Sequence, residues 1–201
     1  MGNLKVEHIQ SRRAFSLVEL LVVLGIIGVL STIAIISFGG PSGSFQLTPA
    51  ANRLKGEINL ARHQAMTMNS SYEIRFFQET AGGDYVGYQV YRVDADGNPV
   101  AENKPEWLPQ EVTIPAERAL SPILTESVIR GTQSSGGPQI NGKSYSAFVF
   151  SSSGTLNDVT SVDNFLTLIL KNAPRSAGAL PDNYAALSIV PATGYVRLTQ
   201  P

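Results

Sequence analysis

The 201-residue chain contains no cysteine, which excludes a disulfide framework and a lipoprotein anchor. His63 has no cysteine or paired carboxylate beside it, so a zinc site lacks ligands. The sequence also lacks a Gly-x-Ser-x-Gly elbow and a phosphate-binding Gly-x-x-x-x-Gly-Lys loop. We therefore expect no catalytic residue, no cofactor and no enzymatic activity.

Charged residues are also scarce. After Phe38 the chain has twelve Lys and Arg against fourteen Asp and Glu, a net charge of −2, with no run of either sign. A surface of this kind has no electrostatic reason to bind a polyanion. Nucleic acid is therefore not an expected partner.

Residues 15–38 form an apolar run in which Glu19 is the only charge. As a helix the run would be about 36 Å long, enough for the roughly 30 Å hydrocarbon core of a bilayer. The residues before it carry Lys5, Arg12 and Arg13 against Glu7. This basic flank predicts a cytoplasmic N-terminus, a single membrane span and an exported remainder.

A carboxylate inside such a run requires an explanation, because an ionised group near the bilayer interior costs up to about 3 kcal/mol. A new ammonium group one helical turn before Glu19, created by cleavage before Phe15, would offset that cost by pairing with a neighbour's carboxylate. Two alternatives remain open. The run is an ordinary signal-anchor, or it is a secretory signal cut near Ser37-Phe38-Gly39, for which its apolar region is long.

The residues around Glu19 resemble the class III signal of type IV pilins and pseudopilins: Arg12-Arg13-Ala14-Phe15-Ser16-Leu17-Val18-Glu19-Leu20. The resemblance implies that prepilin peptidase cuts between Ala14 and Phe15 and methylates the new N-terminus at Phe15. It also implies that Glu19 helps subunits register in a filament. The usual residue before the cut is Gly rather than Ala14, and the usual helix proline is replaced by Ile36.

The rest of the chain predicts one exported domain. Gly and Pro in residues 39–46 indicate a joint, and Thr48 followed by Pro49 indicates a helix start. The apolar stripe of that helix is Leu47, Ala51, Leu54, Ile58, Ala61, Ala65 and Met68. Residues 1–14, 15–38, 39–46 and 47–201 are thus interpreted as leader, membrane and assembly helix, flexible joint and periplasmic globular domain.

Beyond Asn69 the apolar period changes to two, which is typical of strands. We expect strands at residues 72–76, 85–93, 111–114, 146–151, 165–171, 186–190 and 195–199, with loops at 131–142 and 174–182. Asp94, Asp96 and Asn98 have the spacing that begins a calcium loop, but Pro99 stands where that loop needs Gly, so a hairpin turn is favoured. The predicted class is α+β, with a long hydrophobic helix and an amphipathic helix packed on an antiparallel sheet.

Four stretches of this domain resemble the GspH/FimT branch of minor pseudopilins: NLARHQA (residues 59–65), WLPQEV (107–112), FSSSG (150–154) and LSIVPATGYV (187–196). The chain is also similar to the pilin-signal protein D of the Verru_Chthon cassettes. Arg62, alone among small residues, is expected to anchor its helix to the sheet through a carboxylate or a carbonyl. A partner-binding role for Arg62 stays open.

These patterns together favour a minor pseudopilin, assembled into a type II secretion or type IV pilus-like fibre. Its expected partners are prepilin peptidase, other pseudopilins, an assembly platform with its ATPase, and the inner membrane. One alternative is a DNA-binding minor pilin, although the C-terminal region offers only Lys171, Arg175 and Arg197 for phosphates. The other is a signal-anchored periplasmic binding protein that does not assemble.

Overall fold

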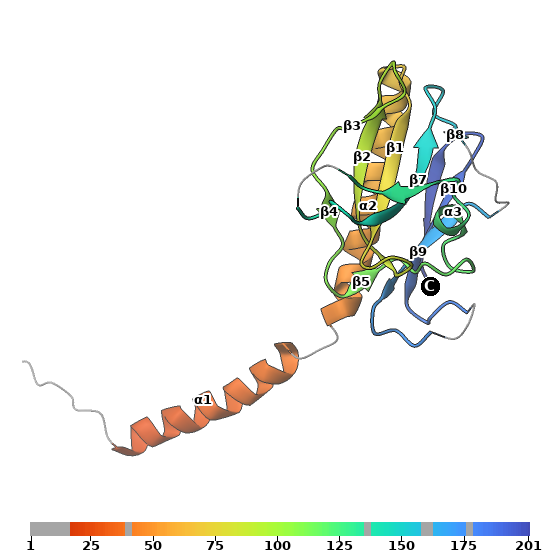
Figure 1. Cartoon of the computed structure of the whole chain (residues 1–201). Coiled ribbons are helices and arrows are strands. Elements are labelled where there is room, and N and C mark those ends of the chain that lie inside the picture. Colours follow the sequence, from red (N-terminus) through yellow and green to blue (C-terminus); the bar gives the residue numbers. More distant parts are fainter. Residues whose placement is uncertain (1–16, 39–41, 135–137, 158–162, 176–178) are drawn as a thin grey trace, which may run out of the picture. The chain divides into compact units, whose positions relative to one another are not determined.

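Figure 1 shows the computed structural model of the chain. It describes residues 17–38, 42–134, 138–157, 163–175 and 179–201, with the backbone alone for 28–38 and 42–45. The chain divides into two compact units, Met1–Pro41 and Ser42–Pro201. The first contains the helix α1 (Leu17–Phe38, 22 residues), and the second contains all the other elements.

The second unit begins with the helix α2 (Ser42–Thr67). The expected helix start at Thr48 is wrong, because Pro49 lies inside α2 and the helix begins within the segment 39–46. Proline removes one main-chain donor from the helix ladder, which weakens a turn without ending the helix. The Thr48-Pro49 pair therefore predicted a helix start at a point where α2 is already helical.

Two antiparallel sheets follow α2. Sheet A has the order β3-β2-β1-β7-β6, with β4 pairing with β2 and β8 with β7, and sheet B has the order β11-β10-β9-β5. The strands of sheet A are β1 (Tyr72–Gln78), β2 (Tyr85–Val93), β3 (Pro99–Ala101), β4 (Glu106–Trp107), β6 (Ile129–Thr132), β7 (Ser144–Phe150) and β8 (Leu156–Asn157). Those of sheet B are β5 (Val112–Thr113), β9 (Phe165–Leu170), β10 (Tyr184–Val190) and β11 (Tyr195–Thr199), and a short helix α3 spans Pro122–Thr125.

This arrangement confirms the predicted α+β class. All seven expected strands are present, as β1, β2, β5, β7, β9, β10 and β11. The expected loop over residues 131–142 is wrong at its start, since β6 continues to Thr132 and pairs with β7. Strands as short as β3, β4 and β8 contain too few residues to establish an alternating pattern.

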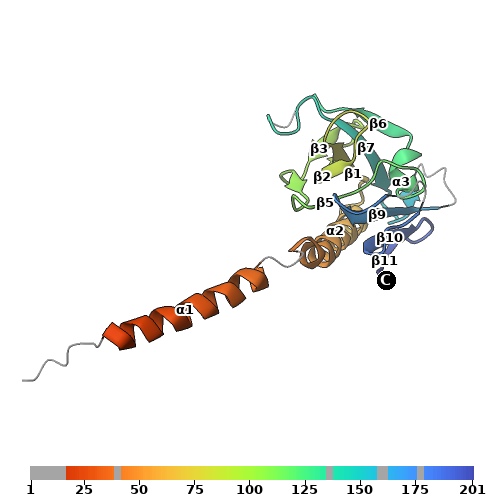
Figure 2. The same ribbon diagram turned by 90° about the horizontal axis from the view of Figure 1, so that it is seen from below.

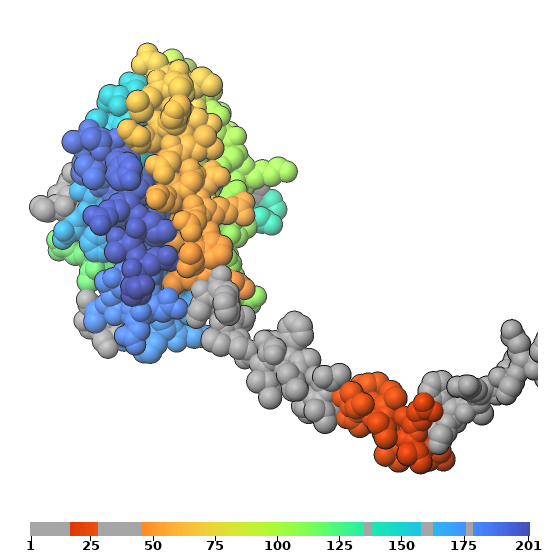
Figure 3. All heavy atoms as spheres, turned by 180° about the vertical axis from the view of Figure 1, so that it is seen from behind, coloured from red at the N-terminus to blue at the C-terminus, as the bar shows by residue number. Residues whose placement is uncertain are grey.

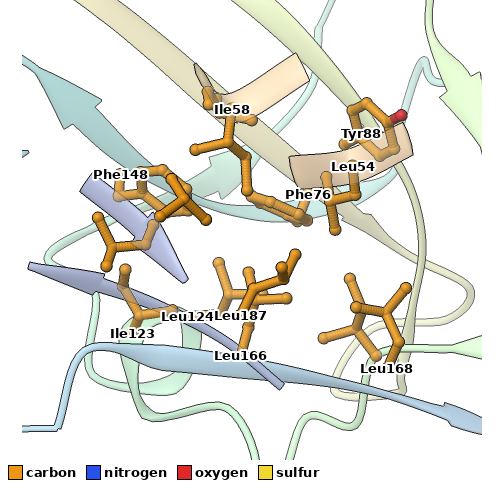
Figure 4. Packing of buried hydrophobic residues seen from close by; sticks show 14 of the residues in the cluster. Leu54, Ile58, Phe76, Tyr88, Ile123, Leu124, Phe148, Leu166, Leu168 and Leu187 are labelled. Atoms are coloured by element: carbon orange, nitrogen blue, oxygen red, sulfur yellow. The ribbon is translucent and has the colours of Figure 1, made fainter. Parts of the chain in front are cut away.

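The core lies between α2 and the two sheets (Figure 2). Helix α2 buries Leu47, Ala50, Ala51, Leu54, Ile58, Ala61 and Ala65. Figure 4 shows Leu54 and Ile58 next to Phe76 of sheet A, with Leu166 and Leu187 of sheet B below them. Burying a Leu or Ile side chain contributes roughly 1.5–3 kcal/mol. The predicted stripe is therefore confirmed from Leu47 to Ala65.

Met68 is the exception in that stripe. It is 66% exposed and follows the last residue of α2, so its expected place in the core is wrong. Asn69 takes a left-handed φ of 48°, which turns the chain out of the helix before β1. The apolar spacing of the stripe thus continues to Met68 in the sequence, although the helix ends at Thr67.

Helix α2 and β11 run beside each other on one face of the unit (Figure 3). Gln200 Nε2 donates to Thr48 Oγ1 over 3.0 Å, close to the start of the helix. Gly194, at the other end of β11, lies against Arg62. The C-terminal strand is therefore antiparallel to α2.

Candidate assembly helix and surface sites

Helix α1 has one charge, Glu19, which lies in its first turn. All side chains described in α1, residues 17–27, are exposed, with Leu17 at 80% and Val23 at 46%. Apolar residues surround the helix on every side, which is typical of a helix that is covered by lipid or by other helices. Among the residues described, no helix combines the length and hydropathy of a membrane span.

The other predicted processing residues, Arg12, Arg13, Ala14 and Phe15, lie outside the described residues. Glu19 alone can be located. A carboxylate in the first turn of a helix is favourably placed against the helix dipole, a contribution of about 0.3–1 kcal/mol at an exposed site. Glu19 is therefore an exposed carboxylate in the first turn of an apolar helix.

Arg62 lies on the side of α2 that faces the ends of the two sheets. Its Nε donates to the carbonyl oxygen of Gly154 over 3.3 Å. The expectation that Arg62 anchors the helix through a carbonyl is confirmed. None of the ion pairs found between described residues includes Arg62.

A shallow groove runs beside the first half of α2. It is lined by Gln46, Pro49, Ala50, Arg53, Tyr88, Trp107, Leu108 and Pro109. Glu106 binds two of these residues: it accepts from Arg53 Nη2 over 2.8 Å and from the Tyr88 hydroxyl over 2.9 Å. Burial and the bond to Glu106 raise the pKa of Tyr88, so the phenol stays protonated as a donor. Burial and the nearby Glu106 also raise the pKa of Glu57.

The segment that resembled a calcium loop forms a turn between β2 and β3. Asp94 Oδ1 accepts from the main-chain N–H of Asp96 over 3.0 Å and of Asn98 over 2.7 Å. Gly97 has a φ of 83°, the left-handed conformation that such a turn needs. The favoured hairpin turn is therefore confirmed. Within the described ranges no three His, Cys, Asp or Glu side chains converge as a metal site.

Two of the three C-terminal cations are engaged within the unit. Arg175 forms a bidentate pair with Asp84, and Lys171 Nζ lies 3.5 Å from Glu79 Oε2. Arg197 is exposed on β11. Lys171 and Arg175 therefore do not form an uncompensated basic patch.

A buried charged cluster on the outer face of sheet A was not predicted from the sequence. Arg75 donates through Nε to Glu73 Oε1 over 2.6 Å and through Nη1 to Gln133 Oε1 over 2.7 Å. The Tyr91 and Tyr145 rings lie 4.3 Å and 4.4 Å from its guanidinium carbon. In an alternating strand with a buried Ile74 and Phe76, Glu73 and Arg75 would face solvent, whereas here Gln133, Tyr91 and Tyr145 lie against Arg75.

Two similarities come from sequence comparison with known proteins. Residues 9–35 match the family described as the prokaryotic N-terminal methylation motif. Over 100 residues the chain is 36% identical to type II secretion system protein H of Pseudomonas aeruginosa strain PAO1. That match spans half of this chain and half of the relative.

Two solved structures are also similar. One is the minor pseudopilin EpsH of the type 2 secretion system of Vibrio cholerae, with 14% identity and a TM-score of 0.47, over 78% of this chain and 98% of that one. The other is the type IV minor pilin FimU of Pseudomonas aeruginosa strain PAO1, with 17% identity and a TM-score of 0.44, over 78% and 92%.

The chain thus contains an N-terminal methylation motif and, over half of its length, is related in sequence to a type II secretion system protein H. The motif and the sequence relative confirm the resemblance to GspH/FimT-type pseudopilins that was predicted from the sequence.

Proposed function

We propose that this chain is a minor pseudopilin that is assembled into a type II secretion or type IV pilus-like fibre. The observation that carries the proposal is the match of residues 9–35 to the methylation motif, since that stretch includes Glu19 and the run that forms α1. The relatedness to a type II secretion system protein H supports the same function.

The proposed organisation follows the chain. Residues 1–14 are a leader removed by prepilin peptidase between Ala14 and Phe15, and Phe15 is then methylated. Arg12 and Arg13 keep the leader cytoplasmic. Residues 15–38 span the inner membrane before assembly, residues 39–46 contain the joint, and residues 47–201 are the periplasmic domain.

Assembly is proposed to depend on Glu19. The exposed apolar surface of α1 favours burial against helices of other pilin-like subunits, and a buried carboxylate needs a partner. The new ammonium group at Phe15 of a neighbouring subunit would be that partner. Other pseudopilins, the assembly platform and its ATPase are accordingly the proposed partners, and the structural role requires no catalysis by this chain.

The test compares Glu19→Ala with Leu21→Ala in cells that contain a complete assembly system. Both residues lie in the first turns of α1, and both variants remove one exposed side chain. We expect Glu19→Ala to be processed and held in the membrane but lost from sheared or cross-linked fibres, with Leu21→Ala incorporated normally. Incorporation of Glu19→Ala at the level of the unmodified chain would refute the proposed role of Glu19.

A further inference from the structure

Two turns from different sheets meet at Arg62, at the end of the second unit that is remote from Ser42. Gly154 lies in the turn between β7 and β8, and Gly194 in the turn between β10 and β11. A Cβ on Gly194 would lie 2.1 Å from the Gly154 carbonyl oxygen and 2.8 Å from Arg62 Nε. A Cβ on Gly154 would lie 2.6 Å from Met66 Sδ. A Cβ at Gly194 would therefore collide with the other turn and with Arg62, and a Cβ at Gly154 would collide with Met66 of α2.

Among the described residues, main-chain hydrogen bonds join the two sheets at two places. At the end near the start of α2, Tyr85 of β2 and Ile114 exchange two bonds of 2.8 and 3.0 Å. At the remote end, Leu156 N–H of β8 donates to the Pro191 carbonyl over 2.9 Å. The first connection is a paired bridge, whereas the second is a single bond beside Arg62.

We propose that Arg62 is a positioning residue that latches the two sheets together at this remote end. The latch consists of Arg62, Gly154, Gly194 and the Leu156–Pro191 bond. When the latch opens, the sheets separate at this end while the Tyr85–Ile114 bridge remains closed. The β10–β11 hairpin then moves relative to sheet A, and the motion changes the end surface that the two turns form.

The shape of the arginine side chain explains how residue 62 can contact both turns. The guanidinium is planar and holds its Nε–H in a fixed direction, so a single donor can reach the Gly154 carbonyl while the methylene stem passes Gly194. Both glycines have a left-handed φ, 79° at Gly154 and 64° at Gly194. Side chains are strained in that conformation. A side chain at Gly194 would also collide with Arg62, and one at Gly154 would collide with Met66.

The test uses the full chain in detergent. Because the chain has no native cysteine, pairs of cysteines can be introduced at chosen sites and spin-labelled. One pair joins the sheets, with Ala95→Cys in the β2–β3 turn and Ala192→Cys in the β10–β11 turn. A second pair, Ala95→Cys and Ala81→Cys, lies within sheet A at the two ends of β2. All three alanines are exposed.

Each pair is measured in the unmodified background, in Arg62→Met and in Lys55→Met. Met keeps an apolar stem but cannot donate, and Lys55 is a partly buried base on the same helix. We expect Arg62→Met to broaden the 95–192 distance distribution toward longer distances and to leave the 95–81 distribution unchanged. Lys55→Met should change neither distribution. Unchanged 95–192 distances in Arg62→Met, or equal broadening of both pairs, would overturn the proposal.

Amide hydrogen exchange gives a second readout without labels. In Arg62→Met the Leu156 amide should lose protection, because its acceptor Pro191 moves away. The Tyr85 and Ile114 amides, at the other connection, should keep theirs. Loss of protection at all three amides to the same extent would mean that Arg62 supports the whole unit and that no latch exists.

Discussion

Arg75 is a buried cation in the second unit, and the groups that contact its guanidinium explain why the folded state remains stable. Its side chain is 9% exposed, and that of its partner Glu73 is 8% exposed. Bonds to Glu73 and Gln133 and the faces of Tyr91 and Tyr145 replace the lost hydration. Removing two charges from water is costly, so the pair is stable only while both members are present.

Arg75→Ala should therefore destabilise the fold by about 3–5 kcal/mol, because it leaves the Glu73 carboxylate buried without its counter-charge. Chemical denaturation of the full chain in detergent measures this loss. The matched variant Glu73→Gln with Arg75→Met removes both charges and should lose much less. A double variant that is as unstable as Arg75→Ala would show that shape, and not charge pairing, governs this cluster.

We expect the stability of the fold to depend on pH through Glu57, which lies on α2 near Glu106. Burial and the neighbouring Glu106 raise its pKa above the ordinary 4.5 in the folded chain. A carboxyl with a raised folded pKa stabilises the fold at low pH and loses that contribution as the pH rises through the folded pKa. Glu57→Gln should thus gain stability relative to the unmodified chain between about pH 4 and pH 7.

The gain should stay below about 1 kcal/mol, because Glu57 is largely solvated and its interactions are screened. Denaturation midpoints at pH 4 and pH 7, compared between the two chains, measure it. A difference that does not change with pH would contradict the assignment of the effect to ionisation of Glu57.

At the scale of elements, the sequence predicted what depends on a long regular pattern. The stripe from Leu47 to Ala65 repeats over five turns, and β2 is a nine-residue run rich in Tyr and Val, so both are recognised in the sequence. The start of α2 and the strand β6 were not predicted. The helix α2 continues through Pro49, so the local Thr-Pro signal does not mark its start, and β6 depends on its pairing with β7, which lies further along the chain.

Glycine positions in two elements give opposite predictions. A Cβ at Gly56 in α2 meets nothing within 4 Å, so Gly56→Ala should stabilise the fold by about 0.5–1 kcal/mol. A Cβ at Gly87 in β2 would lie 2.6 Å from Trp107 Cε3, so Gly87→Ala should destabilise it and displace β4.

Trp107 is the only tryptophan, so its fluorescence reports the displacement of β4 directly. Denaturation curves and emission spectra of the two variants are the measurements. A normal emission spectrum with unchanged stability in Gly87→Ala would contradict the close packing of β2 against β4.

At the scale of the whole molecule, the sequence indicated an apolar helix followed by a compact α+β unit, and the structure shows that division at Ser42. The division into two sheets, the groove at Trp107 and the Arg75 cluster were not predictable. Each depends on residues far apart in sequence, such as Arg75 and Gln133, whose meeting no local pattern encodes. Arg62 was the exception, because a lone arginine among small residues suggested its anchoring role.

The proposed function requires that residues 1–14 form a leader and that the remainder is processed as a pilin-like subunit. Intact mass and N-terminal sequence of the chain recovered from membranes, with and without prepilin peptidase, test this directly. We expect a chain that starts at Phe15, carries one extra methyl group and appears only with the peptidase. A chain that stays uncleaved, or is cut near Gly39, would contradict the proposed function.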